Sequence, residues 1–391
     1  MRYNFDKVID RSGTSAEKVE GLKHIWGRTD LIPLWVADMD FATAPFVTDA
    51  IRKRCENEVL GYTGKPDSYY NAIINWVKQR YDLIVTKEVI NFVPGIVPGI
   101  GMAMNCFTQK GDKVMIQPPV YHPFAWVTTR NERTLVTNPL KWENGMYRMD
   151  LDTFREQIKG CKLFILCNPH NPGGVVWTEA ELRAIADICY DEKVLVFSDE
   201  IHADLTLPPH THRPFATVSE KARMNSVTFM SPSKAFNMPG LSASHALIFN
   251  EDLRKRFRIY MDAGELDMGH VFAFLSVEAA YSHGTEWLDQ CLAYIQGNID
   301  FVDDFLKNHA PKIKAIRPEA SYLVWLDCRE LELSQKDLNE FFVDKAHLAL
   351  NDGEMFGKEG IGFMRLNVAS PRCIIEKAMK QLADAYQLYI K

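Results

Sequence analysis

The feature that most constrains the fold is a series of short apolar runs in the middle of the chain. They occupy residues 113–116, 162–167, 194–197, 227–230 and 246–249. Strands with one solvent-exposed face alternate apolar and polar residues, whereas strands buried on both faces form nearly continuous apolar runs. The runs therefore predict a mostly parallel central sheet that is flanked by helices.

The segment between the second and third runs predicts a helix. Thr178 and Glu181 have the spacing of a capping box, in which each side chain satisfies a backbone N–H at the start of the helix. Apolar residues then recur at helical spacing, at Leu182, Ile185, Ile188 and Cys189. A strand, a helix and another strand in this order form the βαβ unit of an α/β fold with a doubly wound sheet.

After about residue 285 the apolar pattern changes. Apolar residues at helical spacing from Leu288 to Leu306 predict a long helix that ends before Pro311. It is followed by a strand-like segment at 321–327, an acidic stretch at 327–337, a second strand-like segment at 363–369 and a terminal helix. We expect the acidic stretch to be a solvated helix face. This mixture of elements predicts a smaller α+β domain.

The length of 391 residues suits two domains. We expect a large domain at residues 49–285, a small domain at 286–391 and an N-terminal arm at 1–48 that is part of the small domain. The arm has too little periodic structure to fold alone, so we expect it to pack on the rest of the chain.

Charge and cysteine content exclude several classes of protein. The net charge of −6 does not favour nucleic acid or an anionic membrane as a partner. The eight cysteines include no CxxC pair, which argues against a zinc site or a disulfide framework and favours a reducing cytoplasm. The N-terminus lacks the apolar core of a signal peptide, and prolines and glycines interrupt the uncharged run at 92–107. We therefore expect a soluble, cytoplasmic protein.

Polar side chains follow three of the apolar runs directly. The motif NPHNPGG comes after the second run, SDEIH after the third and SPSK after the fourth. These motifs contain Asn171, Asp199, Ser231, Ser233 and Lys234. We expect them to line one site, because the carboxyl ends of parallel strands meet at one rim of the sheet, where α/β folds bind ligands. A glycine-rich turn at 94–99 opens an apolar helix and can present backbone N–H groups to an anion.

Seven segments of the chain carry a family resemblance. They are PLWVADMDF (33–41), GYTGKPDSY (61–69), PPVYHPF (118–124), NPHNPGG (168–174), SDEIHADL (198–205), SPSKAFNMPGL (231–241) and RLNVASPR (365–372). Together they resemble the fold-type I pyridoxal 5'-phosphate (PLP) enzymes, the aspartate aminotransferase superfamily, and within it the cystathionine β-lyase branch of MalY/PatB-type C–S lyases. The resemblance covers essentially the whole chain. It implies a PLP cofactor, an amino-acid substrate and a homodimer with shared active sites.

The resemblance implies a role for each residue of the site. Lys234 matches the lysine that carries PLP as a Schiff base and later removes the α-proton of the substrate. Asp199 matches the carboxylate that pairs with the pyridine nitrogen and, held ionised, favours the protonated ring. Asn171 matches the amide beside the ring hydroxyl, and Tyr121 matches the aromatic residue that stacks on the ring. His202 either touches the same ring oxygen or only packs beside it.

The resemblance also implies contacts to the phosphate and to the substrate. The phosphate contacts are the backbone amides of Gly95, Ile96 and Val97, the hydroxyls of Ser231 and Ser233, and Tyr62. In the family, the tyrosine that matches Tyr62 reaches in from the neighbouring subunit. Arg365 matches the arginine that binds the substrate α-carboxylate as a planar bidentate donor, and Ala37 is expected on the substrate side. Tyr62 and Tyr121 are both candidates for handling the proton of the leaving thiolate.

One position departs from the aminotransferase pattern. Aminotransferases of this fold commonly place a phosphate-binding arginine eight residues after the lysine, and this chain has Ser242 there. The C–S lyase branch resembles this chain in lacking that arginine, so the change favours a lyase. His202, His210 and His212 show no consistent ligand spacing, and no metal site is predicted.

We therefore predict a PLP-dependent C–S β-lyase of amino-acid metabolism. Its substrates would be L-cystathionine, L-cysteine or related β-thio amino acids, and its products a thiol, pyruvate and ammonia. The alternative is an aminotransferase of class I/II, because the two reactions share their early steps and the sequence does not decide where they part. A third alternative is a regulatory protein that binds a transcription activator, although no residue pattern identifies a surface for it.

Overall fold

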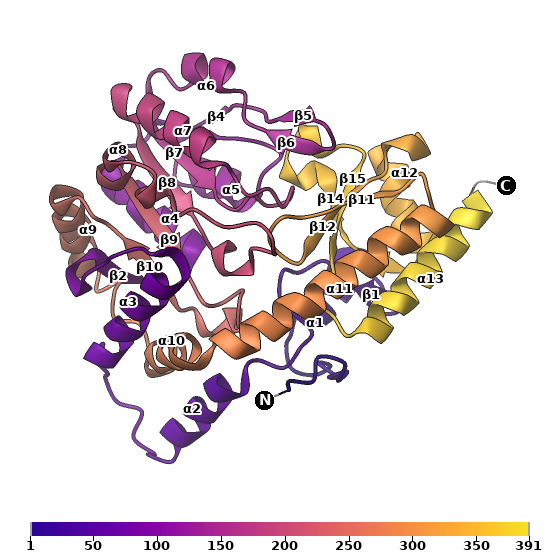
Figure 1. Cartoon of the computed structure of the whole chain (residues 1–391), viewed down its shortest axis with the longest axis horizontal. Helices are drawn as coiled ribbons and strands as arrows, with labels where there is room; N and C mark the ends of the chain where they lie inside the picture. The colour runs from indigo at the N-terminus through magenta and orange to yellow at the C-terminus, as the bar shows by residue number, and fades with distance from the viewer. Residues whose placement is uncertain (1, 390–391) are drawn as a thin grey trace.

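The computed structural model describes residues 2–389 and contains two main sheets. The larger has seven strands in the order β2-β10-β9-β8-β7-β3-β4, and the smaller has four strands in the order β11-β12-β15-β14. Figure 1 shows the larger sheet in the purple to coral part of the chain and the smaller one in the orange and yellow part. The long helix α11 (Thr285–His309) extends from the larger part toward the smaller one.

The strands of the larger sheet confirm a mostly parallel arrangement. They are β2 (Ile90–Val93), β3 (Lys113–Ile116), β4 (Thr134–Thr137), β7 (Cys161–Cys167), β8 (Leu195–Asp199), β9 (Ser226–Met230) and β10 (Ser244–Leu247). Neighbouring strands from β4 to β9 pair in parallel, whereas β10 is antiparallel to both β9 and β2. The boundaries predicted for the run at 246–249 are wrong, because β10 ends at Leu247 and the buried Ile248 already donates its backbone N–H to Val89.

Helices cover both faces of this sheet. The helices of this part of the chain are α2 (Pro45–Cys55), α3 (Asp67–Tyr81), α4 (Ile96–Phe107), α5 (Pro123–Arg130), α6 (Leu151–Gln157), α7 (Glu179–Asp191), α8 (Glu220–Met224), α9 (Glu251–Ala263) and α10 (Val271–His283). On β7, Leu163 belongs to the core cluster that contains α4, and the next residue, Phe164, belongs to the cluster that contains α7. α7 begins with the predicted capping box, in which Thr178 and Glu181 bond each other's backbone N–H.

The smaller sheet is antiparallel throughout. Its part of the chain contains β11 (Lys314–Ile316), β12 (Leu323–Asp327), α12 (Gln335–Glu340), β13 (Leu348–Ala349), β14 (Asn351–Asp352), β15 (Phe363–Asn367) and α13 (Arg372–Tyr389). The predicted long helix, the strand-like segments and the terminal helix are all found here. The acidic stretch at 327–337 is not one helix face, because Asp327 ends β12 and Ser334 caps α12 by accepting from the backbone N–H of Asp337.

The N-terminal segment contains more regular structure than its sequence predicted. It forms α1 (Glu17–Trp26) and β1 (Ile32–Pro33), and β1 pairs in parallel with β13. A separate hairpin elsewhere is formed by β5 (Lys141–Glu143) and β6 (Met146–Arg148). The pairing of β1 with β13 joins the arm to the smaller part, and the domain boundaries at residues 48 and 285 stay predictions.

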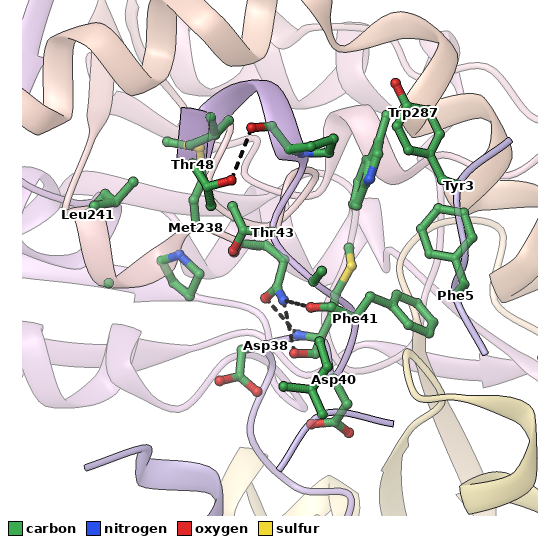
Figure 2. Close-up of a pocket in the computed structure, with 18 of the residues that line it drawn as sticks. Tyr3, Phe5, Asp38, Asp40, Phe41, Thr43, Thr48, Met238, Leu241 and Trp287 are labelled. Carbon is green, nitrogen blue, oxygen red and sulfur yellow. Dashed lines mark hydrogen bonds between the residues drawn. The ribbon is translucent and has the colours of Figure 1, made fainter. Parts of the chain in front are cut away.

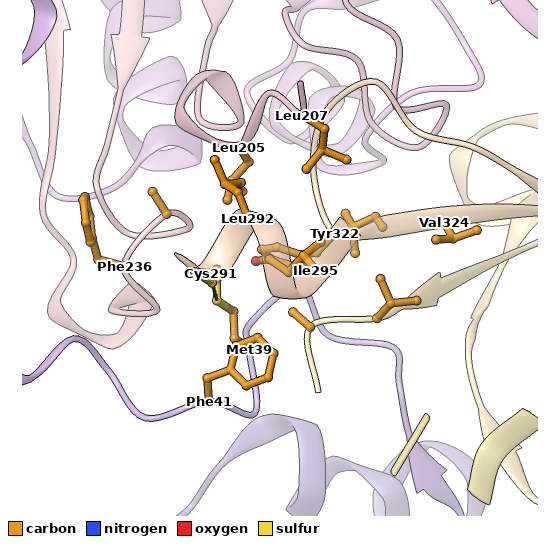
Figure 3. Packing of buried hydrophobic residues seen from close by; sticks show 14 of the residues in the cluster. Met39, Phe41, Leu205, Leu207, Phe236, Cys291, Leu292, Ile295, Tyr322 and Val324 are labelled. Atoms are coloured by element: carbon orange, nitrogen blue, oxygen red, sulfur yellow. Dashed lines mark hydrogen bonds between the residues drawn. The ribbon is translucent and has the colours of Figure 1, made fainter. Parts of the chain in front are cut away.

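One hydrophobic core connects the two sheets (Figure 3). On α11, Cys291, Leu292 and Ile295 pack in the same cluster as Leu205, which follows β8, and Tyr322, which precedes β12. This shared core holds the two sheets together, so side chains from both can meet at one site. Among residues 2–389, no helix is long and apolar enough to cross a bilayer.

Candidate active site

A cavity of about 210 Å³ lies beside the carboxyl ends of β7, β8 and β9. The residues predicted from the sequence that line it are Ala37, Gly95, Ile96, Val97, Tyr121, Asn171, Asp199, His202, Ser233 and Lys234. The first turn of α4 lies on one side of this cavity, and Lys234 follows β9. The structure therefore brings together groups that are separated by up to about half of the chain.

Lys234 is the amine of this cavity. Its Nζ donates a hydrogen bond to the backbone carbonyl of Ala37 at 2.6 Å. Burial lowers the pKa of Lys234 to about 8, although the carboxylates of Asp38 and Asp199 act in the opposite direction. An amine with such a pKa has a substantial neutral fraction near neutral pH, and a neutral amine can act as a nucleophile or as a base.

Asp199 is a carboxyl group with little compensation for its burial. It is 3% exposed, and its Oδ1 accepts one hydrogen bond, from the backbone N–H of Ile201 at 3.1 Å. Burial raises the pKa of Asp199 to about 7, and the nearby Lys234 only partly offsets this. The ionised form expected from the sequence therefore requires a cationic partner inside the cavity.

Arg365 on β15 lies behind Asn171, to which its Nη1 donates at 3.0 Å. Its Nη2 donates to Asn351 Oδ1 at 2.5 Å and to the backbone carbonyl of Trp35 at 3.1 Å. Its Nε is buried and has no hydrogen-bond partner among residues 2–389. Burial lowers the pKa of Arg365 to about 10, so the guanidinium stays charged at neutral pH. A buried cation held by neutral oxygens suits an anionic ligand such as a carboxylate.

The end of the cavity at α4 suits a phosphate. Gly95 precedes the helix with φ +132°, a conformation that favours glycine, and Ile96 and Val97 form the first turn. The free N–H groups of a helix N-terminus attract anions. Ser233 lines this cavity, and Ser231 lies behind it, with the two Oγ atoms 2.9 Å apart.

Tyr62 does not reach the cavity of its own chain. It is 98% exposed in the connection between α2 and α3. His202 does line the cavity, and its Nδ1 is buried without a partner in the part of the chain that the structure describes. Burial lowers the pKa of His202 to about 3, so the ring is neutral, and both interpretations of this residue stay open.

His210 and His212, for which the sequence predicts no metal site, lie beside carboxylates. His212 Nε2 lies 2.8 Å from Glu200 Oε2, and both side chains are buried. His210 is partly exposed and lies 3.6 Å from Glu319. Within residues 2–389, no three His, Cys, Asp or Glu side chains come together as they would around a metal ion.

Several residues of the site were missed by sequence reasoning. Tyr322 donates its hydroxyl to the Ala37 carbonyl at 2.9 Å, and Asn351 accepts from Arg365. Neither stands in a polar motif, so the sequence offered no signal for them. Asn367 donates to the carbonyls of Val36 and Asp38, and its place two residues after Arg365 on β15 was a usable signal. Asn367 therefore shares a strand face with a residue that was already a candidate.

The comparison with known proteins defines the class of this protein. The family described as aminotransferase class I and II matches residues 29–382, and the chain belongs to that family. It is 38% identical to cystathionine β-lyase PatB of Bacillus subtilis (strain 168) over 98% of this chain and 99% of that protein. It is 31% identical to protein MalY of Escherichia coli (strain K12) over 98% of each.

A solved structure narrows the class further. The PLP-bound C–S lyase from Staphylococcus hominis is 35% identical, with a TM-score of 0.92 over 99% of this chain and 98% of that one. Within the family, the chain is therefore similar to the cystathionine β-lyases and C–S lyases. This confirms the resemblance recognised in the sequence.

The residues of the cavity fit PLP. The amine of Lys234 suits the aldehyde of the cofactor, and the buried carboxyl of Asp199 lacks the cation that a protonated pyridine nitrogen would supply. The helix N-terminus after Gly95 and the hydroxyl of Ser233 suit the phosphate. Ser242 also lines the cavity, at the position where aminotransferases commonly place an arginine.

Proposed function

We propose that this chain is a PLP-dependent C–S β-lyase. It would cleave L-cystathionine or related β-thio amino acids, with water, to a thiol, pyruvate and ammonia. The observation that carries the proposal is that Lys234 and Asp199 line the same cavity. Burial lowers the pKa of Lys234 to about 8 and raises the pKa of Asp199 to about 7. The 38% identity to cystathionine β-lyase PatB over nearly the whole chain supports the choice of reaction.

We propose that the residues of the cavity hold PLP in one orientation. Lys234 would attach the cofactor covalently, and Asp199 would pair with its ring nitrogen. Gly95, Ile96, Val97 and Ser233 would bind the phosphate at the start of α4. When bound, PLP supplies an electron sink for the negative charge left on the substrate α-carbon.

The chain's own residues would handle the substrate as follows. Arg365 would bind the α-carboxylate through its unpartnered Nε side, and Asn171 would keep the guanidinium in place. The Lys234 amine, once free, would take the proton from the α-carbon. Its lowered pKa supplies the neutral form that this step requires. The Ala37 carbonyl, 2.6 Å from Nζ, would fix the direction of the amine.

We also propose a homodimer in which Tyr62 of one copy completes the phosphate site of the other. Support comes from the exposure of a continuous apolar segment around this tyrosine, in which Val59 is 71%, Leu60 58% and Tyr62 98% exposed. Exposed apolar side chains in such a group are typical of protein contacts.

A reducing cytoplasmic location is part of the same proposal, supported by eight free cysteines.

An aminotransferase of the same family is the second candidate. It would use the same amine of Lys234 and carboxylate of Asp199 in this cavity and the same Arg365 beside Asn171. Ser242 in the cavity wall disfavours it, because that position lacks the cation common in aminotransferases.

The test is pyruvate formation from L-cystathionine by PLP-loaded protein in the absence of any keto acid. Steady pyruvate with an equal amount of free thiol supports the lyase. A single conversion of the cofactor to its amine form, without pyruvate, supports the aminotransferase. The Lys234→Ala variant serves as the blank, and equal pyruvate from it would refute the assigned base.

A further inference from the structure

The segment 34–41, here called the strap, contributes Ala37 to the cavity lining, where the Ala37 carbonyl accepts from Lys234. Each backbone carbonyl from Leu34 to Met39 accepts a hydrogen bond from a distant part of the chain. The donors are Asn367, Arg365, Lys234, Tyr322, Lys18 and Asn237. The Ala37 carbonyl is therefore held in one place, and with it the acceptor of the Lys234 amine.

The strap also carries two carboxylates, Asp38 and Asp40, which lie at one end of a larger open cleft (Figure 2). Arg11 donates to Asp38 Oδ2 at 2.6 Å and to Asp40 Oδ1 at 3.1 Å. The ammonium of Lys18, whose side chain is fully buried on α1, lies 2.8 Å from Asp40 Oδ2 and 3.7 Å from Asp38 Oδ1. Two cations from the N-terminal segment thus neutralise two anions of the strap.

We propose that Arg11 and Lys18 are positioning residues for Lys234. They hold the strap in place through Asp38 and Asp40, and so fix both the Ala37 carbonyl and the charge beside the amine. This inference rests on the proposed function, in which Lys234 is the base. A buried lysine is costly unless it is paired, and among residues 2–389 the Lys18 ammonium pairs only with groups on the strap.

The sign of the electrostatic effect follows from the charges that face Lys234. Asp38 on the strap and Asp199 after β8 favour the protonated amine, whereas Arg365 on β15 disfavours it. His202 also faces the amine, but burial keeps its ring neutral. Any loss of the cations that screen Asp38 therefore favours the protonated form of Lys234 and reduces the neutral fraction at a given pH.

The test compares Lys18→Met with Arg28→Met in the PLP-loaded enzyme. Arg28 lies in the same N-terminal region, but it pairs with Asp30 and Asp344 at 2.6 and 2.9 Å, and neither of these is on the strap. The readout is the pH midpoint of the absorbance change that reports protonation at the bond between PLP and Lys234. We expect Lys18→Met to raise the midpoint by roughly 0.5–1 pH unit and Arg28→Met to leave it unchanged.

A second readout does not need the cofactor. Hydrogen exchange of the backbone amides at 35–41 is measured in apoprotein by mass spectrometry. Loosening of the strap predicts exchange about tenfold faster in Lys18→Met, with wild-type rates in Arg28→Met. Equal acceleration in both variants would indicate general destabilisation and would overturn the proposal.

The double variant Lys18→Met/Asp40→Asn tests the role of charge. It leaves one cation, Arg11, against one anion, Asp38, and we expect it to return the midpoint most of the way to the wild-type value. Should Lys18→Met not fold, the partly exposed Arg11→Gln takes its place with the same expected direction. A pH midpoint and an exchange rate that stay at their wild-type values in both Lys18→Met and Arg11→Gln would refute the proposal. If Lys18→Met shows these shifts but the wild-type enzyme makes no pyruvate from L-cystathionine, the proposed function alone is refuted.

Discussion

Two neighbouring carboxyl groups at the end of β8 have opposite surroundings. Glu200 is 1% exposed, and its oxygens are bonded by the Ser198 hydroxyl, the Phe215 backbone N–H and His212, each at 2.8 Å. Asp199 is 3% exposed and accepts one hydrogen bond, from the backbone N–H of Ile201. Successive side chains of a strand point to opposite sides, so one carboxyl faces a complete set of donors and the other faces the cavity.

The number of hydrogen-bond donors around a buried carboxyl group indicates whether its role is structural or functional. A buried carboxylate with three donors is stable in place and needs nothing else. The burial that raises the pKa of Asp199 from 3.8 to about 7 corresponds to a destabilisation of at most roughly 4 kcal/mol above pH 7. Such a group is useful where a ligand later supplies the missing cation, and perturbed groups of this kind cluster at functional sites.

The largest expected effect is on the cavity side, at Lys234. Lys234→Ala removes the amine that would hold the cofactor and take the α-proton. We expect turnover of L-cystathionine to fall by at least about 10³-fold, with loss of the absorbance band of lysine-bound PLP. Turnover near the wild-type rate would remove Lys234 from the mechanism.

Asp199→Asn tests the comparison directly. An amide cannot supply the negative charge that pairs with the ring nitrogen, so we expect kcat to fall by about 10²–10³-fold. Glu200→Gln is the matched control, one residue away. We expect the kcat of this variant, calculated per folded molecule, to stay within about tenfold of wild type. Equal losses in the two variants would show that the difference in their surroundings has no functional meaning.

Arg365→Lys examines another charged group of the site, whose hydrogen-bond partners within residues 2–389 are neutral oxygens. A lysine keeps the charge but cannot bind a carboxylate through two parallel N–H groups. We expect the KM for the amino acid to rise by about 10–10²-fold, with a smaller change in kcat. Arg372→Lys, at the start of α13 and bonded to Asn298, is the control. An unchanged KM in Arg365→Lys would place the substrate carboxylate elsewhere.

Sequence reasoning located the residues that follow strand ends. Asn171, Asp199 and Lys234 stand directly after apolar runs, and parallel strands bring such positions to one rim. The apolar pattern alone does not distinguish Asp199 from Glu200, because the side of β8 that faces the cavity depends on packing against other elements, and it was the family resemblance that pointed to Asp199. Tertiary folding alone places Ala37 against the amine, since the two are far apart in the chain.

For the fold, the sequence predicted the positions of most buried strands but not the direction of β10 or the edge strand β4. The strand at β3 was found with both boundaries, because its apolar run is bounded by polar residues. The direction of β10 was not, since an apolar run carries no information on parallel or antiparallel pairing. The edge strand β4 has partly exposed side chains and gave no continuous apolar signal.

The apoprotein should show the stability effect of Asp199. Since the pKa in the folded state is raised, the native state binds more protons than the unfolded state between about pH 4 and 7, and stability falls as the pH rises through this window. Asn cannot ionise, so Asp199→Asn should be more stable than wild type by about 2 kcal/mol at pH 8, with little difference at pH 4. Urea unfolding of PLP-free protein at both pH values measures this. A variant less stable at pH 8 would contradict the assigned burial cost.

Glu200→Gln should lower the free energy of unfolding, whereas Asp199→Asn raises it, and the change should be smaller. The amide can still accept from Ser198 and Phe215 through its oxygen, but its NH2 group replaces the acceptor that faces His212. A weakened buried hydrogen bond of this kind lowers stability by about 1–2 kcal/mol. The same urea series measures it at pH 8, and His212→Gln should give a similar loss, with less than additive loss in the double variant because the two residues share one interaction. Additive losses would mean that His212 and Glu200 stabilise the fold through separate contacts. His212 would then not be one of the partners that distinguish Glu200 from Asp199.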